Sequence, residues 1–142
     1  MSSRWEPSPG IRRGNHVIHN LHAHLVFVTK YRREVFKREM LTRCETIMRD
    51  VCESFGVQLH EFNGEGDHVH LLVHYPPKIA LSKLVNSLKG VSSRYLRAEY
   101  TDRINQTGAG SVLWSPSYFA GSCDGAPLNV VNDYIDNQKR PA

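Results

Sequence analysis

The sequence lacks any stretch that would span a membrane. Its longest uncharged apolar runs, residues 21–29 and 69–73, are interrupted by histidines and are far shorter than the ~20 residues of a bilayer-spanning helix. The first residues include Arg4, Glu6 and Pro7 and contain no apolar segment of the kind found in secretory signals. We therefore expect a protein of the cytoplasm.

Cysteine is scarce as well. The chain has three cysteines, and none belongs to a Cys-x-x-Cys pair. Cys44 and Cys52 fall on the apolar stripe of a predicted helix, so both are expected to be buried, reduced thiols. No signature of a catalytic cysteine surrounds Cys44, Cys52 or Cys123, which disfavours cysteine-based catalysis.

The composition is that of an ordinary folded domain with a basic bias. Of the 142 residues, 40% are hydrophobic and 23% are charged, and the formal net charge is +4. Basic side chains concentrate in two segments, 30–38 and 78–97. Such clusters suit a nucleic-acid backbone, where neutralised phosphates release counterions. A solvated helix face explains the charge equally well, so charge alone does not decide the function.

Hydrophobic periodicity predicts a series of strands and helices. Residues 1–20, rich in Pro, Gly, Arg and Asn, are expected to form an irregular lead-in, and residues 21–142 a single domain. Strand and helix patterns follow in the order β-α-β-β-α-β, with one more helix at the end. The predicted strands are 21–29, 57–62, 68–75 and 114–120, and the predicted helices are 36–55, 81–100 and 128–138.

Breaker residues support these boundaries. Gly56 follows the first helix, as a helix C-terminal glycine does, and residues 63–67 predict a tight turn within a hairpin. Pro116 interrupts the last strand. The resulting order predicts an α+β, ferredoxin-like fold, in which two helices cover one face of an antiparallel sheet.

A His-x-His pair lies at the start of the third predicted strand. Side chains alternate along a strand, so His68 and His70 point to one face while Val69 points to the other. Two imidazoles on one face can converge on a metal ion. The pair is also typical of an ordinary exposed strand, so it is weak evidence by itself.

A second pair, His22 and His24, lies on the first predicted strand. The first and third strands of a ferredoxin-like sheet are neighbours, so both pairs can share one face, and alternation does not choose between them. The position directly after a turn favours His68 and His70 as ligands. We expect His22 and His24 to be packing or DNA-proximal residues and His74 to be an exposed histidine at a strand end.

The last predicted helix adds a second group. Tyr134 and Gln138 are four residues apart and therefore lie on the same side of a helix. Leu128, Val131 and Ile135 form an adjoining apolar stripe that would dock the helix. By itself Tyr134 fits a half-buried packing residue. Together with the histidine pair, it indicates an active site.

In combination, these motifs resemble the IS200/IS605-type transposases, the single-tyrosine members of the HUH endonuclease superfamily. The resemblance covers residues 20–138 and implies metal-binding roles for His68 and His70, a third ligand at Gln138, and Tyr134 as the nucleophile on the C-terminal helix. Five ordered segments carry the resemblance, namely residues 21–33, 67–73, 88–94, 114–119 and 134–138.

The resemblance also implies an activity. Such a protein cleaves and rejoins single-stranded transposon ends that carry hairpins, through a 5′-phosphotyrosine intermediate and with Mg²⁺ or Mn²⁺. It works as a homodimer with an active site shared between subunits, in the cytoplasm of a bacterium or an archaeon. The candidate DNA contacts are Lys30, Arg32, Arg33, Lys89 and Arg94.

Two other functions compete with this interpretation. A histidine-triad nucleotide hydrolase needs a third histidine at the next alternate position, where Leu72 and Val26 stand instead. A non-catalytic, host-adopted protein that binds single-stranded or hairpin DNA would keep the basic residues and lose the chemistry. The presence of His68, His70, Tyr134 and Gln138 together argues against that loss.

Overall fold

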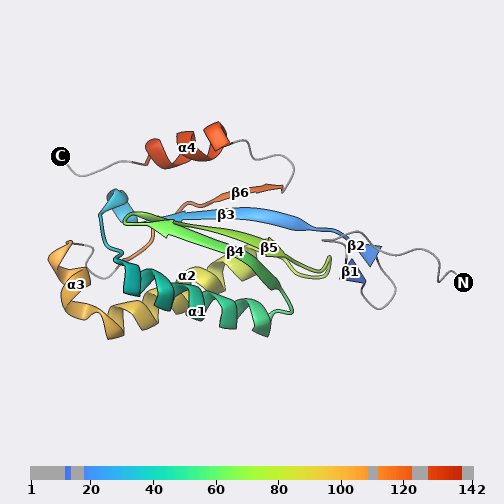
Figure 1. The fold of residues 1–142 in the computed structure, drawn as a ribbon, viewed down its shortest axis with the longest axis horizontal. Helices are drawn as coiled ribbons and strands as arrows, with labels where there is room; N and C mark the ends of the chain where they lie inside the picture. The colour runs from blue at the N-terminus through green and yellow to red at the C-terminus, as the bar shows by residue number, and fades with distance from the viewer. Residues whose placement is uncertain (1–11, 14–17, 109–111, 123–127, 139–142) are drawn as a thin grey trace, which may run out of the picture.

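A four-stranded antiparallel sheet forms the centre of the molecule, in the order β4-β5-β3-β6 (Figure 1). The computed structural model describes residues 12–13, 18–108, 112–122 and 128–138. The strands of the sheet are β3 (His22–Val28), β4 (Gln58–Glu65), β5 (His68–His74) and β6 (Phe119–Ser122). The helices are α1 (Arg38–Ser54), α2 (Leu81–Glu99), α3 (Thr101–Gln106) and α4 (Leu128–Asp136).

This arrangement confirms the predicted α+β, ferredoxin-like order. Helices α1 and α2 cover one face of the sheet, and α4 lies over the other (Figure 1). Strands β3 and β5 are direct neighbours, with His22 opposite His74 and Val28 opposite His68. Most of the predicted lead-in lies outside the described residues. Within it, β1 (Arg12–Arg13) pairs with β2 (Ile18–His19).

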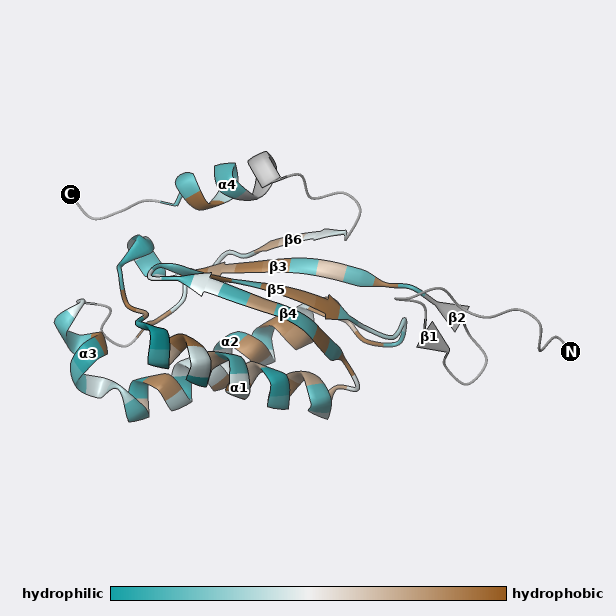
Figure 2. Ribbon diagram, in the orientation of Figure 1, coloured by the Kyte–Doolittle hydropathy of each residue, from teal (hydrophilic) through white to brown (hydrophobic). Residues whose placement is uncertain are grey.

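Alternation along the strands separates an apolar face from a histidine-bearing face. In β5, Val69, Leu71 and Val73 are fully buried and join the core beneath α1 and α2. Burial of such side chains is the main favourable term in folding, at roughly 25 cal/mol per Å² of apolar surface. The residues between them point towards the α4 side. Figure 2 shows a different change along β3, which is largely hydrophilic towards its start and hydrophobic towards its end.

The first helix buries the apolar stripe that the sequence predicts. Cys44 and Cys52 are fully buried in it as free thiols, and burial raises the pKa of each thiol to about 12. The prediction for these two cysteines is therefore confirmed, whereas Cys123 lies outside the described residues. Gly56 follows the helix with a φ of 71°, a left-handed conformation in which glycine is favoured.

The β4–β5 hairpin is tighter than predicted. Strand β4 continues to Glu65, which pairs with His68, so only Gly66 and Asp67 form the turn. Gly64 belongs to the strand and pairs with Val69. A glycine fits here because the chain passes close to α1, where a Cβ would lie 2.6 Å from Leu41 Cδ2. Glycine in a strand often marks such a close approach, and the sequence alone made it look like a turn.

Further boundaries also differ from prediction. The last helix, predicted over 128–138, ends at Asp136, so Gln138 lies just beyond it. The second helix stops before Tyr100, and α3 follows as a separate helix. The last strand begins at Phe119, because Trp114 forms only an isolated bridge with Thr29 ahead of Pro116. Among the described helices, none combines the length and apolar character needed to cross a bilayer.

Candidate active site

Both predicted histidine pairs lie on the same face of the sheet. His68 is opposite Val28 and His70 is opposite Val26, while His24 is opposite Leu72. The side chains of His24 and His70 meet diagonally, with His24 Nδ1 2.8 Å from His70 Nε2 and ring centroids 5.0 Å apart. His24 is therefore a direct neighbour of a predicted ligand, which the spacing in the sequence did not show.

Burial and charge keep His70 neutral. Burial, together with the nearby His24, lowers the pKa of the His70 imidazole below its ordinary value. Since metal ions bind the unprotonated imidazole, this environment favours the form that can act as a ligand.

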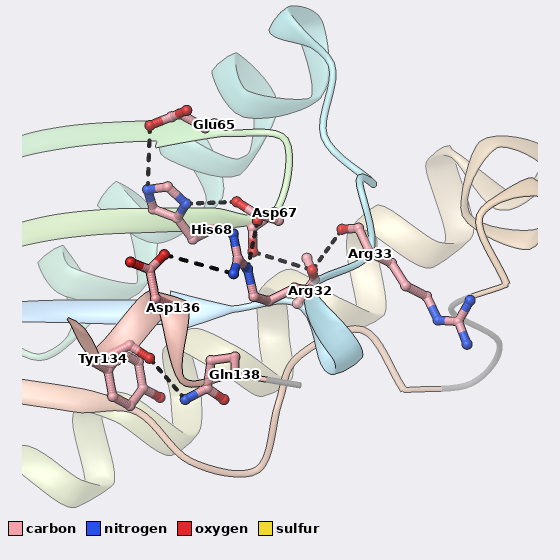
Figure 3. Close-up of polar contacts among 9 residues, drawn as sticks. Arg32, Arg33, Glu65, Asp67, His68, Tyr134, Asp136 and Gln138 are labelled. Atoms are coloured by element: carbon pink, nitrogen blue, oxygen red, sulfur yellow. Dashed lines mark hydrogen bonds and ion pairs between the residues drawn. The ribbon is translucent and has the colours of Figure 1, made fainter. Parts of the chain in front are cut away.

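A carboxylate orients the other predicted ligand. His68 Nδ1 lies 2.8 Å from Asp67 Oδ1, and Asp67 Oδ2 accepts a hydrogen bond of 3.1 Å from Arg32 Nε (Figure 3). Burial opposes ionisation of Asp67, but hydrogen bonds from His68 and Arg32 outweigh it and hold the pKa of this carboxyl below its ordinary value. When Nδ1 donates to Asp67, His68 Nε2 keeps its lone pair, an arrangement common among metal-binding histidines.

Arg32 reaches this site from an unusual turn after β3. The short helix η1 (Lys30–Arg32) holds Tyr31 at a φ of 61° and Arg32 at 54°, both in the left-handed region. Non-glycine residues in this region cost on the order of 1–3 kcal/mol and cluster at functional sites. The turn directs Arg32 to Asp67 and brings its Nη1 3.8 Å from Asp136 Oδ1 in α4.

Tyr134 and Gln138 lie together, as their spacing predicts, but they face the segment that leads into β6. The Tyr134 hydroxyl is 2.9 Å from Ser117 Oγ, and the tyrosine ring lies against Phe119 with centroids 5.9 Å apart. Ser115 Oγ donates to Gln138 Oε1 at 3.3 Å, and Gln138 Nε2 donates to the Tyr134 carbonyl at 3.2 Å. Burial raises the pKa of Tyr134, and the contact with Ser117 only partly offsets this effect.

Apolar contacts dock α4 on the sheet in this position. Val26 and Val28 are fully buried in a small cluster with Phe119, Tyr134 and Ile135. Of the predicted docking stripe, Ile135 makes the expected contact. The side chains of Leu128 and Val131 lie outside the described part of the chain.

The other side of α4 faces the histidines. Asn132 and Ile135 line a pocket of about 220 Å³ with His68 and His70, and an adjoining pocket of about 360 Å³ also includes Asp136. Figure 3 shows His68 over β5 and Tyr134 towards β6, with β3 between them. Among the contacts described for the chain, none joins Tyr134 or Gln138 to His68 or His70.

Lys89 holds the segment that contacts Tyr134. Its Nζ donates to the carbonyls of Ser115, Pro116 and Ser117 at 2.7, 3.2 and 3.4 Å. Burial lowers the pKa of this ammonium group. Sequence reasoning missed the roles of Asp67, Ser115 and Ser117, although each belongs to one of the segments that carried the family resemblance.

The remaining candidate DNA contacts lie on two elements. Lys30 Nζ and the Arg33 guanidinium lie 5.5 and 5.6 Å from the ring centre of Tyr31, beside η1. Arg94 lies over the Tyr95 ring on α2, which is on the opposite face of the sheet from α4 (Figure 1).

One expectation for the histidine face is wrong. His74 is not exposed: only 1% of its surface is accessible, and its ring stacks on His22 with centroids 4.0 Å apart. Its side chain is covered in part by neighbouring rings, His22 from β3 and His60 from β4.

The chain resembles known proteins over most of its length. A family profile described as "Transposase IS200 like" matches residues 17–138. The ISDra2 transposase TnpA of Deinococcus radiodurans is 29% identical over 128 residues, or 90% of this chain and 91% of the relative. The transposase for insertion sequence element IS200 of Salmonella typhimurium is 32% identical over 123 residues, or 87% of this chain and 80% of the relative.

Solved structures share the fold. A crystal structure from Deinococcus radiodurans, assigned as a transposase, superposes with a TM-score of 0.84 at 29% identity and covers 92% of this chain and 99% of its own. A REP-associated tyrosine transposase bound to a REP hairpin superposes with a TM-score of 0.51 at 10% identity, covering 89% of this chain and 69% of its own. At that identity, the second match concerns the fold alone.

Proposed function

The chain belongs to the IS200-like transposase family, and from this membership we propose that it cleaves and rejoins single-stranded DNA through Tyr134. The family implies a DNA-processing enzyme. The observation that carries the finer proposal is the position of α4, which has Tyr134, with Gln138 just beyond the helix end, on one side and the His68–His70 pocket on the other.

The proposed reaction is a transesterification. The Tyr134 oxygen attacks the scissile phosphorus, an O–P bond to the tyrosine forms, and the bond to the 3′ oxygen breaks. The phenol loses its proton, and the departing strand leaves as a free 3′-hydroxyl. Because the ester bond is kept as a 5′-phosphotyrosine, a 3′-hydroxyl can attack it later and rejoin DNA without ATP.

The two histidines fit a divalent metal ion. His70 is held neutral by its surroundings, and Asp67 leaves the Nε2 lone pair of His68 available. With the amide oxygen of Gln138 as a third ligand, the set would hold Mg²⁺ or Mn²⁺. When bound, such an ion supplies Lewis-acid polarisation of the phosphate. The chain's own residues orient the ligands and hold the nucleophile.

We propose that the complete site forms between two copies of the chain. Within one chain, α4 turns Tyr134 and Gln138 towards Ser117 and Ser115, away from the pocket with His68. If α4 docked instead on a second copy of the chain, it would bring Tyr134 to the histidines of that copy. In the docked position, burial raises the pKa of Tyr134 and so favours the protonated phenol, the resting form of the proposed nucleophile.

The proposed substrate is single-stranded DNA with hairpins at transposon ends, processed in the cytoplasm, where such DNA arises. The basic candidates would bind its phosphates. Arg32 is engaged inside the protein by Asp67, Lys89 by three carbonyls and Arg33 by the Thr107 carbonyl. Lys30 and Arg94 are therefore the first contacts to test.

The test is formation of a covalent protein–DNA adduct. With Mn²⁺ and labelled single strands that carry the element's own hairpin ends, the wild-type chain should form an adduct that survives denaturation, and Tyr134→Phe should form none. Binding without any adduct in the wild type would instead support the non-catalytic DNA-binding function.

A mixing experiment tests the shared site. Tyr134→Phe and His68→Gln/His70→Gln proteins, each inactive alone, are unfolded and refolded together to exchange subunits. Activity should return, because a mixed dimer contains one site with an intact tyrosine and intact histidines. If the mixture stays inactive while mixed dimers are present, the site lies within one chain.

A further inference from the structure

We propose that His22, His60 and His74 form a second metal site, which takes Zn²⁺ or a similar transition-metal ion. One ring nitrogen from each of these residues lies within 4.8 Å of the others. In the described part of the chain, this is the one group of three or more His, Cys, Asp or Glu side chains that meets so closely. It does not include His68 or His70.

Strand pairing brings the three rings together. His22 begins β3 and His74 ends β5, where the two are opposite each other and stack at 4.0 Å with an angle of 25° between their planes. His60 lies edge-on to both, with centroids 5.3 Å from each. His22 and His74 are 38 and 14 positions from His60 in the sequence, yet all three meet at one end of the sheet. Their spacing along the chain does not indicate this contact.

A β-bulge directs His60 into this group. The pairing of β4 with β5 skips a residue between Leu59 and Glu61, so His60 is the extra residue of the bulge. Bulges re-aim side chains and recur beside functional sites. Leu59 keeps its place in the core, while His60 turns to the histidine face.

A neighbouring amide fixes the ring of His60. Its Nε2 lies 3.1 Å from Gln58 Oε1, a carbonyl oxygen that can only accept, so Nε2 donates and Nδ1 keeps the lone pair. Histidines that bind metals are commonly oriented by such an acceptor on the other nitrogen.

The ligand set selects the type of ion. Three imidazoles suit Zn²⁺, Co²⁺ or Ni²⁺, whereas Mg²⁺ prefers oxygen ligands. Tetrahedral Zn²⁺ with bonds of about 2.0–2.1 Å needs ligand nitrogens roughly 3.3 Å apart, so nitrogens that lie within 4.8 Å of one another need to close by at most about 1.5 Å. His74 is buried and His60 is exposed, so an ion can enter from the side of His60.

The second site is separate from the proposed catalytic one. His68 and His74 stand at opposite ends of β5, about 20 Å apart along an extended strand. An ion bound at His74 would tie together β3, the bulge in β4 and the end of β5. The inference therefore stands independently of the proposed transposition chemistry.

The experiment measures Co²⁺ binding to the full chain without an affinity tag. The starting protein is His68→Gln/His70→Gln, which removes the proposed catalytic ligands. We expect one Co²⁺ per chain and the intense visible absorption of a four-coordinate ion, with Zn²⁺ displacing it and raising the melting temperature.

Two variants in this background locate the ion. His60→Ala, an exposed position that should leave the fold intact, is expected to weaken Co²⁺ binding more than the roughly 10- to 100-fold typical of losing an orienting residue. Gln58→Ala should weaken it within that range, and His24→Ala should leave it unchanged. The inference is overturned if the starting protein binds no Co²⁺, or if folded His60→Ala binds it as tightly as its parent.

Discussion

The two sides of α4 are held by different kinds of interaction. On one side, Tyr134 and Gln138 contact Ser117 and Ser115 through neutral hydroxyl hydrogen bonds. On the other, the pocket with His68 is organised by a buried carboxylate that binds both His68 and Arg32. Hydrogen bonds to charged groups are about twice as strong as neutral ones. Charged hydrogen bonds therefore organise the histidine side, whereas neutral hydrogen bonds and the apolar contacts with Val26 and Val28 hold the tyrosine side.

The largest effect should come from the carboxylate on the histidine side. Asp67→Asn removes the charge that orients His68, so we expect Mn²⁺ affinity and the rate of adduct formation to fall roughly 10- to 100-fold. Asp136→Asn is the matched control for Mn²⁺ affinity, because Asp136 is 73% exposed and its 3.8 Å contact with Arg32 does not orient His68. Equal Mn²⁺ affinity in Asp67→Asn and wild type would contradict the assigned role of Asp67.

A smaller effect is expected from the lysine behind the tyrosine side. Lys89→Met keeps the aliphatic stem and removes the donor to three carbonyls, so unfolding free energy should fall by about 1–2 kcal/mol. Mn²⁺ affinity should not change, because the Lys89 ammonium group contacts the 115–117 segment and the Tyr118 ring and has no described contact with His68 or His70. Denaturant unfolding and metal titration separate the two effects, and a loss of Mn²⁺ affinity would show that the two sides of α4 are coupled.

The pH dependence of unfolding free energy tests the charged contacts that Asp67 makes with His68 and Arg32. Folding lowers the pKa of Asp67, so its stabilising contribution is complete above the unfolded value of 3.8 and is lost as pH falls through the folded pKa. In metal-free denaturant unfolding, the difference in stability between wild type and Asp67→Asn should shrink as the solution is acidified below that value. A difference that stays constant with pH would contradict the ion-pair role.

The smallest effect is expected from the hydroxyl that contacts the nucleophile. Ser117→Ala removes a neutral, exposed hydrogen bond to Tyr134, so unfolding free energy should change by no more than about 1 kcal/mol. Adduct formation should stay within about fivefold of wild type, since each 1.4 kcal/mol corresponds to tenfold in rate. A complete loss of adduct would mean that Ser117 takes part in the chemistry.

Local patterns predicted the fold well because they are repeated many times along each element. The alternation of Val69, Leu71 and Val73 with histidines defined both faces of β5, and the periodicity of α1 identified Cys44 and Cys52 as buried. The family resemblance supplied the candidate ligands and nucleophile. Their roles stay predictions; in the structure α4 ends at Asp136, and Gln138 follows it while keeping a hydrogen bond to the Tyr134 carbonyl.

Features that depend on contacts distant in sequence escaped prediction. The partners of Tyr134 and Gln138 are set by how α4 docks on Val26, Val28 and Phe119, which periodicity does not describe. The bulge that turns His60 towards His74 results from the pairing register of two strands. The extension of β4 through Gly64 reflects the close packing of α1, and glycine is equally common in turns.

The left-handed turn at Tyr31 and Arg32 gives the site an adjustable charge balance. Arg32 lies between two carboxylates, Asp67 in the hairpin turn and Asp136 in α4. If α4 leaves its docked position, Asp136 leaves with it, while Asp67 remains attached to Arg32 and His68. The pocket then gains one unit of positive charge at the moment when it opens, and the electrostatic attraction for an incoming phosphate rises with the same movement.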